Sequence, residues 1–323
     1  MRLTATLGMP VILAAGLMIG CGEKDEDSGS ATDDTAAQAN SWPYSVAGLA
    51  ELSSGECPDM SESGSTSTFL SSDEERVVTT IFPSAPDSDT KVIFFFHGLM
   101  DSSHGSPSST FASAFSMQSI ADDLNAIIVL PESNVWELFG FSFYLWDVEE
   151  GTFDKDVTLF DDLRTCVYNQ FQPNMDKLFS MGFSGGGLFT TIITSQRGDT
   201  LAGVVEMSGG ADLDTGFLEG IVAPYSTPST SVPVYLTSGG EDDVWPNAQL
   251  VIVNFEEGTE TLASNLAADG HFVVRCSHSS GHTVTNADFN AAWDFVEAHE
   301  YGQPSPYETN GIGDWSSWCE VVQ

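Results

Sequence analysis

The residues best placed for chemistry surround Ser184, in the sequence Gly182-Phe-Ser-Gly-Gly186, which matches the pattern G-x-S-x-G. An apolar run at 178–181 precedes it and predicts a buried strand, while a second run at 188–193 predicts a helix. A serine on a sharp turn between strand and helix projects its hydroxyl from the edge of a sheet, where it can act as a nucleophile. The amide of Gly185 would then lie at a helix N-terminus, where developing negative charge is stabilised.

A serine hydroxyl needs a base to take its proton, and the base needs an acid to orient it. With this kind of turn, acid and base follow the serine on loops after later strands. We expect His282 to be the base, because it lies beyond the strand predicted at 272–275 and follows Gly281, which permits a sharp turn. His278 is the alternative on this loop. His299 ends the last predicted helix and is expected at the surface.

The acid is expected on the loop that follows the strand predicted at 234–237. Spacing favours Asp242 over its neighbour Asp243. Asp212 and Asp214, which follow an earlier strand, are further alternatives. Each of these carboxylates could instead cap a loop, as an Asp close to glycine commonly does.

A second group of candidates follows a predicted central strand, where the chain reads His97-Gly98-Leu99-Met100. Gly98 would let the next backbone amides turn inward. The amide of Leu99, or that of Met100, would then donate an oxyanion hydrogen bond beside that of Gly185. Losing one such donor costs about 3 kcal/mol in the transition state. His97 is expected to hold this loop in place rather than to react.

The elements that must position these residues alternate between strand and helix. The predicted strands are 77–82, 92–96, 127–130, 178–181, 202–207, 234–237 and 272–275, and the predicted helices are 111–124, 156–171, 188–193 and 286–298. The run at 92–96 is continuously apolar, as a parallel strand buried on both faces should be. This order predicts an α/β fold with a mostly parallel, doubly wound sheet flanked by helices. The polar stretch at 53–72 is expected to wrap the domain surface.

Four motifs arrive in order along the chain: Phe95-Phe96-His97-Gly98, Gly182-Phe183-Ser184-Gly185-Gly186-Gly187, Gly239-Gly240-Glu241-Asp242 and Gly281-His282. Together they resemble α/β-hydrolases of the polyhydroxybutyrate depolymerase-like and feruloyl esterase-like family, which includes bacterial lipoproteins and secreted esterases. The resemblance spans about Val92 to Val296. One departure is Ser238, where many members have a histidine.

The resemblance implies the α/β-hydrolase fold and hydrolysis of carboxylic esters through an acyl-enzyme. Ser184 would be the nucleophile, His282 the base and Asp242 the acid that orients it. It also implies that the aromatic segment 136–146 roofs the pocket. Trp146 and Trp245 would either stack against a substrate or belong to the core. Two other functions stay open, a serine peptidase of the same fold and a catalytically inactive binding lipoprotein at the cell surface.

The N-terminus has the composition of an export signal. Residues 1–20 carry Arg2 and an apolar core too short and too interrupted by glycine to span a membrane. The sequence Met18-Ile-Gly-Cys21 resembles a bacterial lipobox, which implies lipidation at Cys21. Residues 21–45 are predicted to form an acidic flexible tether, and 46–323 the hydrolase domain. The expected location is the bacterial cell envelope, at the outer membrane or cell surface, or else outside the cell.

Acidic residues dominate the charge of the chain. Asp and Glu number 47 against 9 Lys and Arg, which gives a formal net charge of -38. Such a surface repels nucleic acid and anionic lipid headgroups. Nucleic acid is therefore not expected as a partner, and membrane contact is expected only through the lipid anchor. The resemblance implies an ester substrate, possibly polymeric.

Beyond Cys21, the chain has an even set of cysteines: Cys57, Cys166, Cys276 and Cys319. In an exported protein this predicts two disulfides, whose connectivity the sequence does not determine. Cys276 is close to His282 in sequence, so one bridge is expected to pin the loop that carries the base. No metal-ligand spacing is present, and neither a metal nor a cofactor is predicted.

Overall fold

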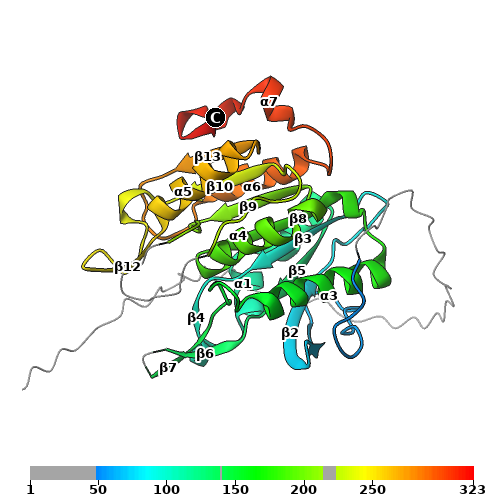
Figure 1. The fold of residues 1–323 in the computed structure, drawn as a ribbon. Helices are drawn as coiled ribbons and strands as arrows, with labels where there is room; N and C mark the ends of the chain where they lie inside the picture. The colour runs from blue at the N-terminus through cyan, green and yellow to red at the C-terminus, as the bar shows by residue number, and fades with distance from the viewer. Residues whose placement is uncertain (1–48, 139, 214–222) are drawn as a thin grey trace, which may run out of the picture. The chain divides into compact units, whose positions relative to one another are not determined.

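A nine-stranded sheet runs through the computed structural model, which describes residues 49–138, 140–213 and 223–323 (Figure 1). In sheet order its strands are β1 (Thr66–Ser71), β2 (Glu74–Ile81), β5 (Ala126–Pro131), β3 (Lys91–Phe96), β8 (Leu178–Phe183), β9 (Gly203–Met207), β10 (Val234–Ser238), β13 (Val273–Ser277) and β14 (Cys319–Val322). The six strands from β5 to β13 in this order are parallel. The edge strands β1, β2 and β14 pair antiparallel with their neighbours. The predicted mostly parallel α/β sheet is confirmed.

Helices cover both faces of this sheet. On one face lie α3 (Asp154–Phe171), α4 (Gly185–Arg197) and α5 (Phe255–Ala268), and on the other α1 (Pro107–Ala114), α2 (Met117–Leu124) and α6 (Asn286–Ala298). The short α7 (Pro306–Asn310) lies near the end of the chain. Successive side chains of a strand point to opposite faces, so in β3 Phe94 and Phe96 pack into one apolar cluster and Phe95 into the other.

Most of the predicted elements are present, with several differences. The helix expected at 111–124 is the pair α1 and α2, because Ser116 between them has a φ of 52°, which a continuous right-handed helix cannot contain. The polar stretch at 53–72 includes an edge strand, β1. Helix α5 lies where no element was predicted. The last predicted helix is confirmed with its bounds as α6.

Two smaller sheets include the strands that directly follow the loops 97–99 and 239–243. One contains β4 (Met100–Asp101), β6 (Val135–Leu138) and β7 (Phe141–Tyr144), and the other is the hairpin of β11 (Val244–Asn247) and β12 (Leu250–Asn254). The aromatic segment expected to roof the pocket forms the β6–β7 hairpin, on which Trp136 and Phe141 are about half exposed. Trp146 beyond it is 1% exposed and stacks on Phe189, so it belongs to the core.

Two disulfides link the four predicted cysteines. Cys57 is bonded to Cys166 of α3, and Cys276 of β13 is bonded to Cys319, its register partner in β14. The prediction of two disulfides is confirmed. The second bridge fixes the strand that leads directly into the loop carrying His282.

Most positive side chains of the described residues are held by carboxylates. Ion pairs join Arg76 to Asp156, Lys91 to Glu297, Lys155 to Glu74, Lys177 to Asp89, Arg197 to Asp161 and Arg275 to Glu256. Within the ranges that the structure describes, the helices are too short or too polar to cross a bilayer. The predicted export signal, the tether and Cys21 lie outside the described residues.

Candidate active site

Ser184 lies on the sharp turn between β8 and α4, as the sequence pattern predicts. Its backbone has φ 58° and ψ −123°, a conformation that is unfavourable for a residue with a side chain. The turn is possible because two glycines let strand and helix approach closely. A Cβ atom on Gly182 would lie 2.1 Å from the Gly186 carbonyl oxygen, and one on Gly186 would lie 2.0 Å from that of Phe96. The glycines of the pattern are therefore required by packing.

The structure brings the predicted base to the predicted nucleophile. His282 lies on the loop between β13 and α6, and its Nε2 is 2.8 Å from the hydroxyl of Ser184. The preceding residue, Gly281, has a φ of 71°, a left-handed conformation that glycine adopts without strain. Residues 98 positions apart in the chain thus share one hydrogen bond at the ends of the parallel strands.

The prediction of Asp242 as the acid is wrong, because the carboxylate behind the ring belongs to Asp243. Its Oδ1 accepts a hydrogen bond from His282 Nδ1 at 2.7 Å, and its side chain is fully buried. A 3₁₀ turn at Gly240–Asp242 rotates the chain between the two residues, which leaves Asp242 exposed and turns the next side chain inward. The alternative Asp212 is exposed and bonds Tyr225 and Asn265, while Asp214 lies outside the described residues.

Two further donors hold the second oxygen of Asp243. Its Oδ2 accepts hydrogen bonds from the hydroxyl of Ser208 at 2.8 Å and from the amide of Gly239 at 2.7 Å. Ser208 follows β9 and was not recognised from the sequence. The only signal available was its place at the carboxyl end of a parallel strand, a position that it shares with many residues of no chemical role.

The other candidate histidines have different surroundings. His278 faces the buried carboxylate of Asp288 through Nε2 at 3.3 Å, while its Nδ1 accepts a hydrogen bond from the Ser280 amide. His299 was expected at the surface but is only 2% exposed. It contacts the carbonyl of Phe295 and the hydroxyl of Ser305, because the chain returns over the end of α6.

His97 holds its loop, as expected, and does not contact Ser184. Its Nε2 accepts a hydrogen bond from the Ser133 amide at 3.1 Å, so Nδ1 carries the proton and donates to the Gly98 carbonyl at 2.7 Å. Burial lowers the pKa of His97 to about 4, which keeps the ring neutral at neutral pH. The indole of Trp146 donates to the His97 carbonyl at 2.9 Å and fixes the backbone ahead of the predicted oxyanion loop.

The amides predicted to form an oxyanion hole are neighbours. The amide nitrogen of Gly185 is in the first residue of α4, where helix N–H groups have no partner within the helix. The amide nitrogen of Leu99 is 3.5 Å from the point that a Cβ on Gly185 would occupy. The side chain of Leu145, just beyond β7, reaches the same point at 3.7 Å. The amide of Leu99 therefore lies close to Gly185, the residue that follows Ser184.

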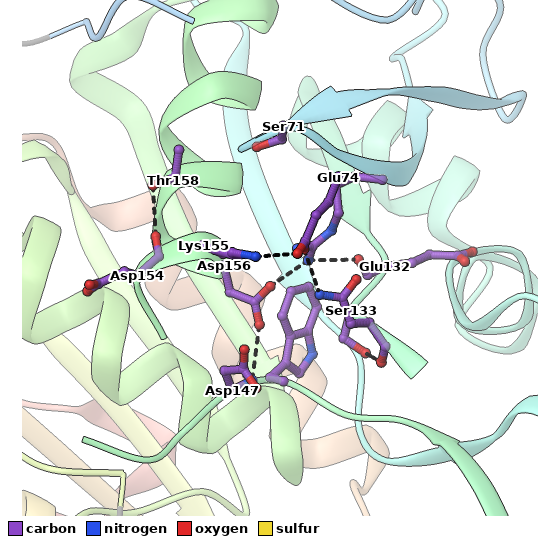
Figure 2. Close-up of polar contacts among 12 residues, drawn as sticks. Ser71, Glu74, Glu132, Ser133, Asp147, Asp154, Lys155, Asp156 and Thr158 are labelled. Atoms are coloured by element: carbon purple, nitrogen blue, oxygen red, sulfur yellow. Dashed lines mark hydrogen bonds and ion pairs between the residues drawn. The ribbon is translucent and has the colours of Figure 1, made fainter. Parts of the chain in front are cut away.

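A buried polar network supports this loop from behind (Figure 2). The guanidinium of Arg76 pairs with Asp156 and donates to the Glu132 carbonyl, next to the residue whose amide binds His97. The second oxygen of Asp156 accepts a hydrogen bond from the Asp147 amide at 3.0 Å. Burial, and then the charge of Asp156, raise the pKa of the Asp147 carboxyl to about 7. The network joins β2, α3 and the segment that follows β5.

Another buried acid, Glu206, lies in β9 two residues before Ser208. Burial raises its pKa to about 8, so it is neutral at pH 7. The hydrogen bonds agree with a neutral acid. The hydroxyl of Thr191 is 2.9 Å from both Glu206 Oε2 and the Gly210 carbonyl, and its single hydrogen can serve only one of them. A protonated Glu206 donates to Thr191, which leaves that hydrogen for Gly210.

The fold is shared with several solved structures. A cysteine variant of pOPH in complex with DMSO superposes with a TM-score of 0.65 at 18% identity, covering 83% of this chain and 96% of that one. Native sOPH superposes with a TM-score of 0.63 at 16% identity, covering 82% and 96%. The chain has the α/β-hydrolase fold. An acylaminoacyl peptidase in complex with a chloromethyl ketone shares this fold more distantly, with a TM-score of 0.54 at 16% identity, covering 77% of this chain and 43% of the peptidase.

In contrast to these structural similarities, no model of a known protein family matches the sequence of this chain, and no curated protein matches it. Its own site must therefore carry the functional argument.

Proposed function

We propose that the protein is a serine hydrolase that cleaves carboxylic esters through an acyl-enzyme. The observation that carries the proposal is the continuous pair of hydrogen bonds from Ser184 through His282 to Asp243, at 2.8 and 2.7 Å. The roles follow from the order of these contacts: nucleophile, base, and the carboxylate that orients the base.

In the first half of the reaction, Ser184 Oγ attacks the ester carbonyl carbon while His282 Nε2 takes its proton. Asp243 accepts from Nδ1, which aims Nε2 at the serine and stabilises the imidazolium. The amides of Leu99 and Gly185 would donate to the oxyanion. As the tetrahedral intermediate collapses, the bond to the alkoxy oxygen breaks, His282 returns the proton to that oxygen, and the alcohol leaves. Water then repeats these steps against the acyl-enzyme and releases the acid and free Ser184.

The resemblance of the four motifs to polyhydroxybutyrate depolymerase-like and feruloyl esterase-like enzymes supports an ester, possibly in a polymer, as the substrate. The acylaminoacyl peptidase shares the fold at a lower TM-score, 0.54 against 0.65 for pOPH. A peptidase is therefore the weaker candidate.

We also propose that the protein is exported and anchored through lipidated Cys21. The two disulfides agree with an oxidising compartment. Expression of the full chain in a bacterium fed an alkyne-tagged fatty acid tests the anchor. Wild type should carry the label in the membrane fraction and Cys21→Ser should not. Equal labelling of both would exclude Cys21 as the lipidation site.

The test of activity compares wild type with Ser184→Ala on p-nitrophenyl acetate and methyl ferulate. We expect turnover by wild type only, and labelling of Ser184 by a fluorophosphonate probe. Equal rates for the two proteins would contradict the proposal, and the absence of both turnover and labelling would support an inactive binding protein. A matched amide substrate turned over faster than its ester would favour the peptidase. A panel of short-chain, feruloyl, acetyl and polyhydroxyalkanoate esters would then identify the acyl group.

A further inference from the structure

Two phenylalanine rings lie parallel to the imidazole of His282. The Phe255 ring has its centroid 4.3 Å from that of the imidazole, with an interplanar angle of 13°. The Phe183 ring is 5.1 Å away at 24°. No contact between these two phenyl rings is found among the described aromatic residues. Since neighbours on one face of so small a ring would touch each other, the two phenyl rings take opposite faces of the imidazole.

Each phenylalanine is tied to one hydrogen-bond partner of His282. Phe183 ends β8 and directly precedes Ser184. Phe255 begins α5, is 3% exposed, and donates its backbone N–H to the carbonyl of Asp243 at 2.9 Å. Each phenylalanine on a face of the imidazole is therefore attached to the residue that binds one ring nitrogen. Phe183 is bonded covalently to Ser184, and Phe255 is hydrogen-bonded to Asp243.

We propose that Phe183 and Phe255 are positioning residues that hold the plane of the His282 ring and favour its charged form, an inference that rests on the proposed function. The faces of an aromatic ring are negative, so a cation stacked on them is stabilised. During acylation and deacylation the imidazole becomes an imidazolium. Rings on both faces would stabilise that charge while they prevent the ring from rotating away from Ser184 and Asp243.

Few charged groups share this environment. Asp243 contacts the ring directly, and Asp242 lies beside Gly281 on the same side. On the neighbouring elements Glu256 of α5 pairs with Arg275 of β13, and His278 pairs with Asp288 of α6, while Glu257 of α5 contacts Asn254 and Glu241 is exposed beside Asp242. The two phenyl rings stack on the imidazole and carry no charge, so their electron density can be changed while these charges are kept.

The experiment replaces each phenylalanine, one at a time, with mono-, di- and trifluorinated phenylalanine by site-specific incorporation into the full chain. Fluorine withdraws electron density from the ring face and changes its size little. The readouts are the plateau of kcat/KM for p-nitrophenyl acetate and the pH at its acid-side midpoint. NMR titration of isotope-labelled histidine gives a third readout, in which the His282 signal is assigned by its loss in His282→Gln.

We expect kcat/KM to fall stepwise with fluorine number, by about two- to five-fold in total at each position. The acid-side midpoint and the NMR titration midpoint should move together to lower pH, by about 0.3 to 0.7 unit. Phe295 supplies a matched control, because its ring lies 4.0 Å from that of the buried His299, a histidine that the proposed reaction does not use. Fluorination of Phe295 should leave all three readouts unchanged.

Failure of this inference is separable from failure of the proposed function. If wild type hydrolyses the ester and fluorine at Phe183 and Phe255 moves no midpoint, the rings act by packing alone and the inference is overturned. If wild type does not hydrolyse esters, the NMR midpoint still decides whether the rings favour the charged imidazole. Phe255→Leu and Phe183→Leu extend the test, since a purely steric role predicts a lower kcat with unchanged midpoints.

Discussion

The loop after β13 carries two histidines, His278 and His282, and each is paired with a carboxylate from another segment. A serine hydroxyl completes only one of these pairs. His282 binds Asp243 through Nδ1 and presents Nε2 to Ser184. His278 uses Nε2 to face Asp288, while its Nδ1 accepts the Ser280 amide, so neither of its nitrogens reaches a nucleophile.

The carboxylates differ in the same way. Asp243 receives hydrogen bonds from Ser208, Gly239 and His282, all of which belong to loops at the ends of parallel strands. Asp288 completes a capping box with Thr285 at the start of α6 and also accepts a hydrogen bond from Thr237. A buried histidine–aspartate pair is thus no sufficient sign of a catalytic site. The third partner, a serine on a strained turn, distinguishes the two.

The largest effect is expected when Asp243 is replaced, with its neighbour Asp242 as the matched control. Asp243→Asn should lower kcat by about 10³- to 10⁴-fold, because an amide cannot hold His282 in the tautomer that accepts the serine proton. Asp242→Asn, in an exposed side chain, should change kcat less than about two-fold. Steady-state kinetics on p-nitrophenyl acetate measures both. A large loss in Asp242→Asn with full activity in Asp243→Asn would reverse the assignment.

The second pair should affect stability and not chemistry. Asp288→Ala removes the carboxylate half of the α6 capping box, while Thr285 remains as N-cap, and it leaves Thr237 without its partner, so we expect the free energy of unfolding to fall by about 2 kcal/mol. The folded variant should keep kcat/KM within about three-fold of wild type, as should His278→Gln. Denaturant unfolding and ester turnover report the two effects. A hundred-fold loss of turnover in either variant at unchanged stability would show that this pair also takes part in catalysis.

Glu206 differs from Asp243 and Asp288, because it is a buried acid that bonds Thr191 and Gly210 and no histidine. Its pKa of about 8 lies above its ordinary value of 4.5, so between these two pH values the native protein holds one more proton than the unfolded chain. Its contribution to stability is therefore complete below pH 4.5 and is lost as pH rises toward about 8, by up to about 1.4 kcal/mol per pH unit.

Glu206→Gln tests this, because a neutral amide can keep the bonds to Thr191 and the Gly210 amide. Denaturant unfolding of both proteins across this range should show the variant gaining stability relative to wild type as pH rises. A difference that stays constant with pH would mean that Glu206 is already ionised in the native state.

The smallest expected effect is at Ser208, which supports Asp243 through one of three donors. Ser208→Ala should lower kcat by about five-fold, equivalent to one hydrogen bond of about 1 kcal/mol, and should leave KM nearly unchanged. Kinetics on p-nitrophenyl acetate would detect it, with Ser208→Thr testing rescue by a hydroxyl. An unchanged kcat in Ser208→Ala would mean that Gly239 and His282 alone fix the carboxylate.

Local sequence predicted those parts of the site that depend on local backbone. The glycines around Ser184 specify the turn because packing excludes any side chain at Gly182 and Gly186. The continuous apolar runs identified the parallel strands, and the apolar face at helical spacing, from Phe289 to Val296, predicted α6 with its bounds. Gly281 and the strand before it were enough to select His282 over His278.

What could not be predicted depends on rotation about a few backbone bonds or on distant contacts. Asp242 and Asp243 are adjacent in sequence, and the 3₁₀ turn that ends at Asp242 decides which side chain faces inward. Phe255 has no local signal for its place against His282, since its segment was not recognised as a helix and the contact joins residues 27 positions apart. Ser208 likewise acquires its role only when β9 lies beside β10.

The pairing of positive side chains affects how substrate and product approach and leave the site. With six cations of the described residues held by carboxylates, little of the surface can attract an anion. An ester is uncharged when it arrives, but the acid that leaves is a carboxylate at neutral pH. In the field of a chain with a formal net charge of -38, the departing product is repelled and the arriving substrate is not. Hydrolysis would thus turn an uncharged molecule into one that the protein's field repels, which opposes inhibition by accumulated product.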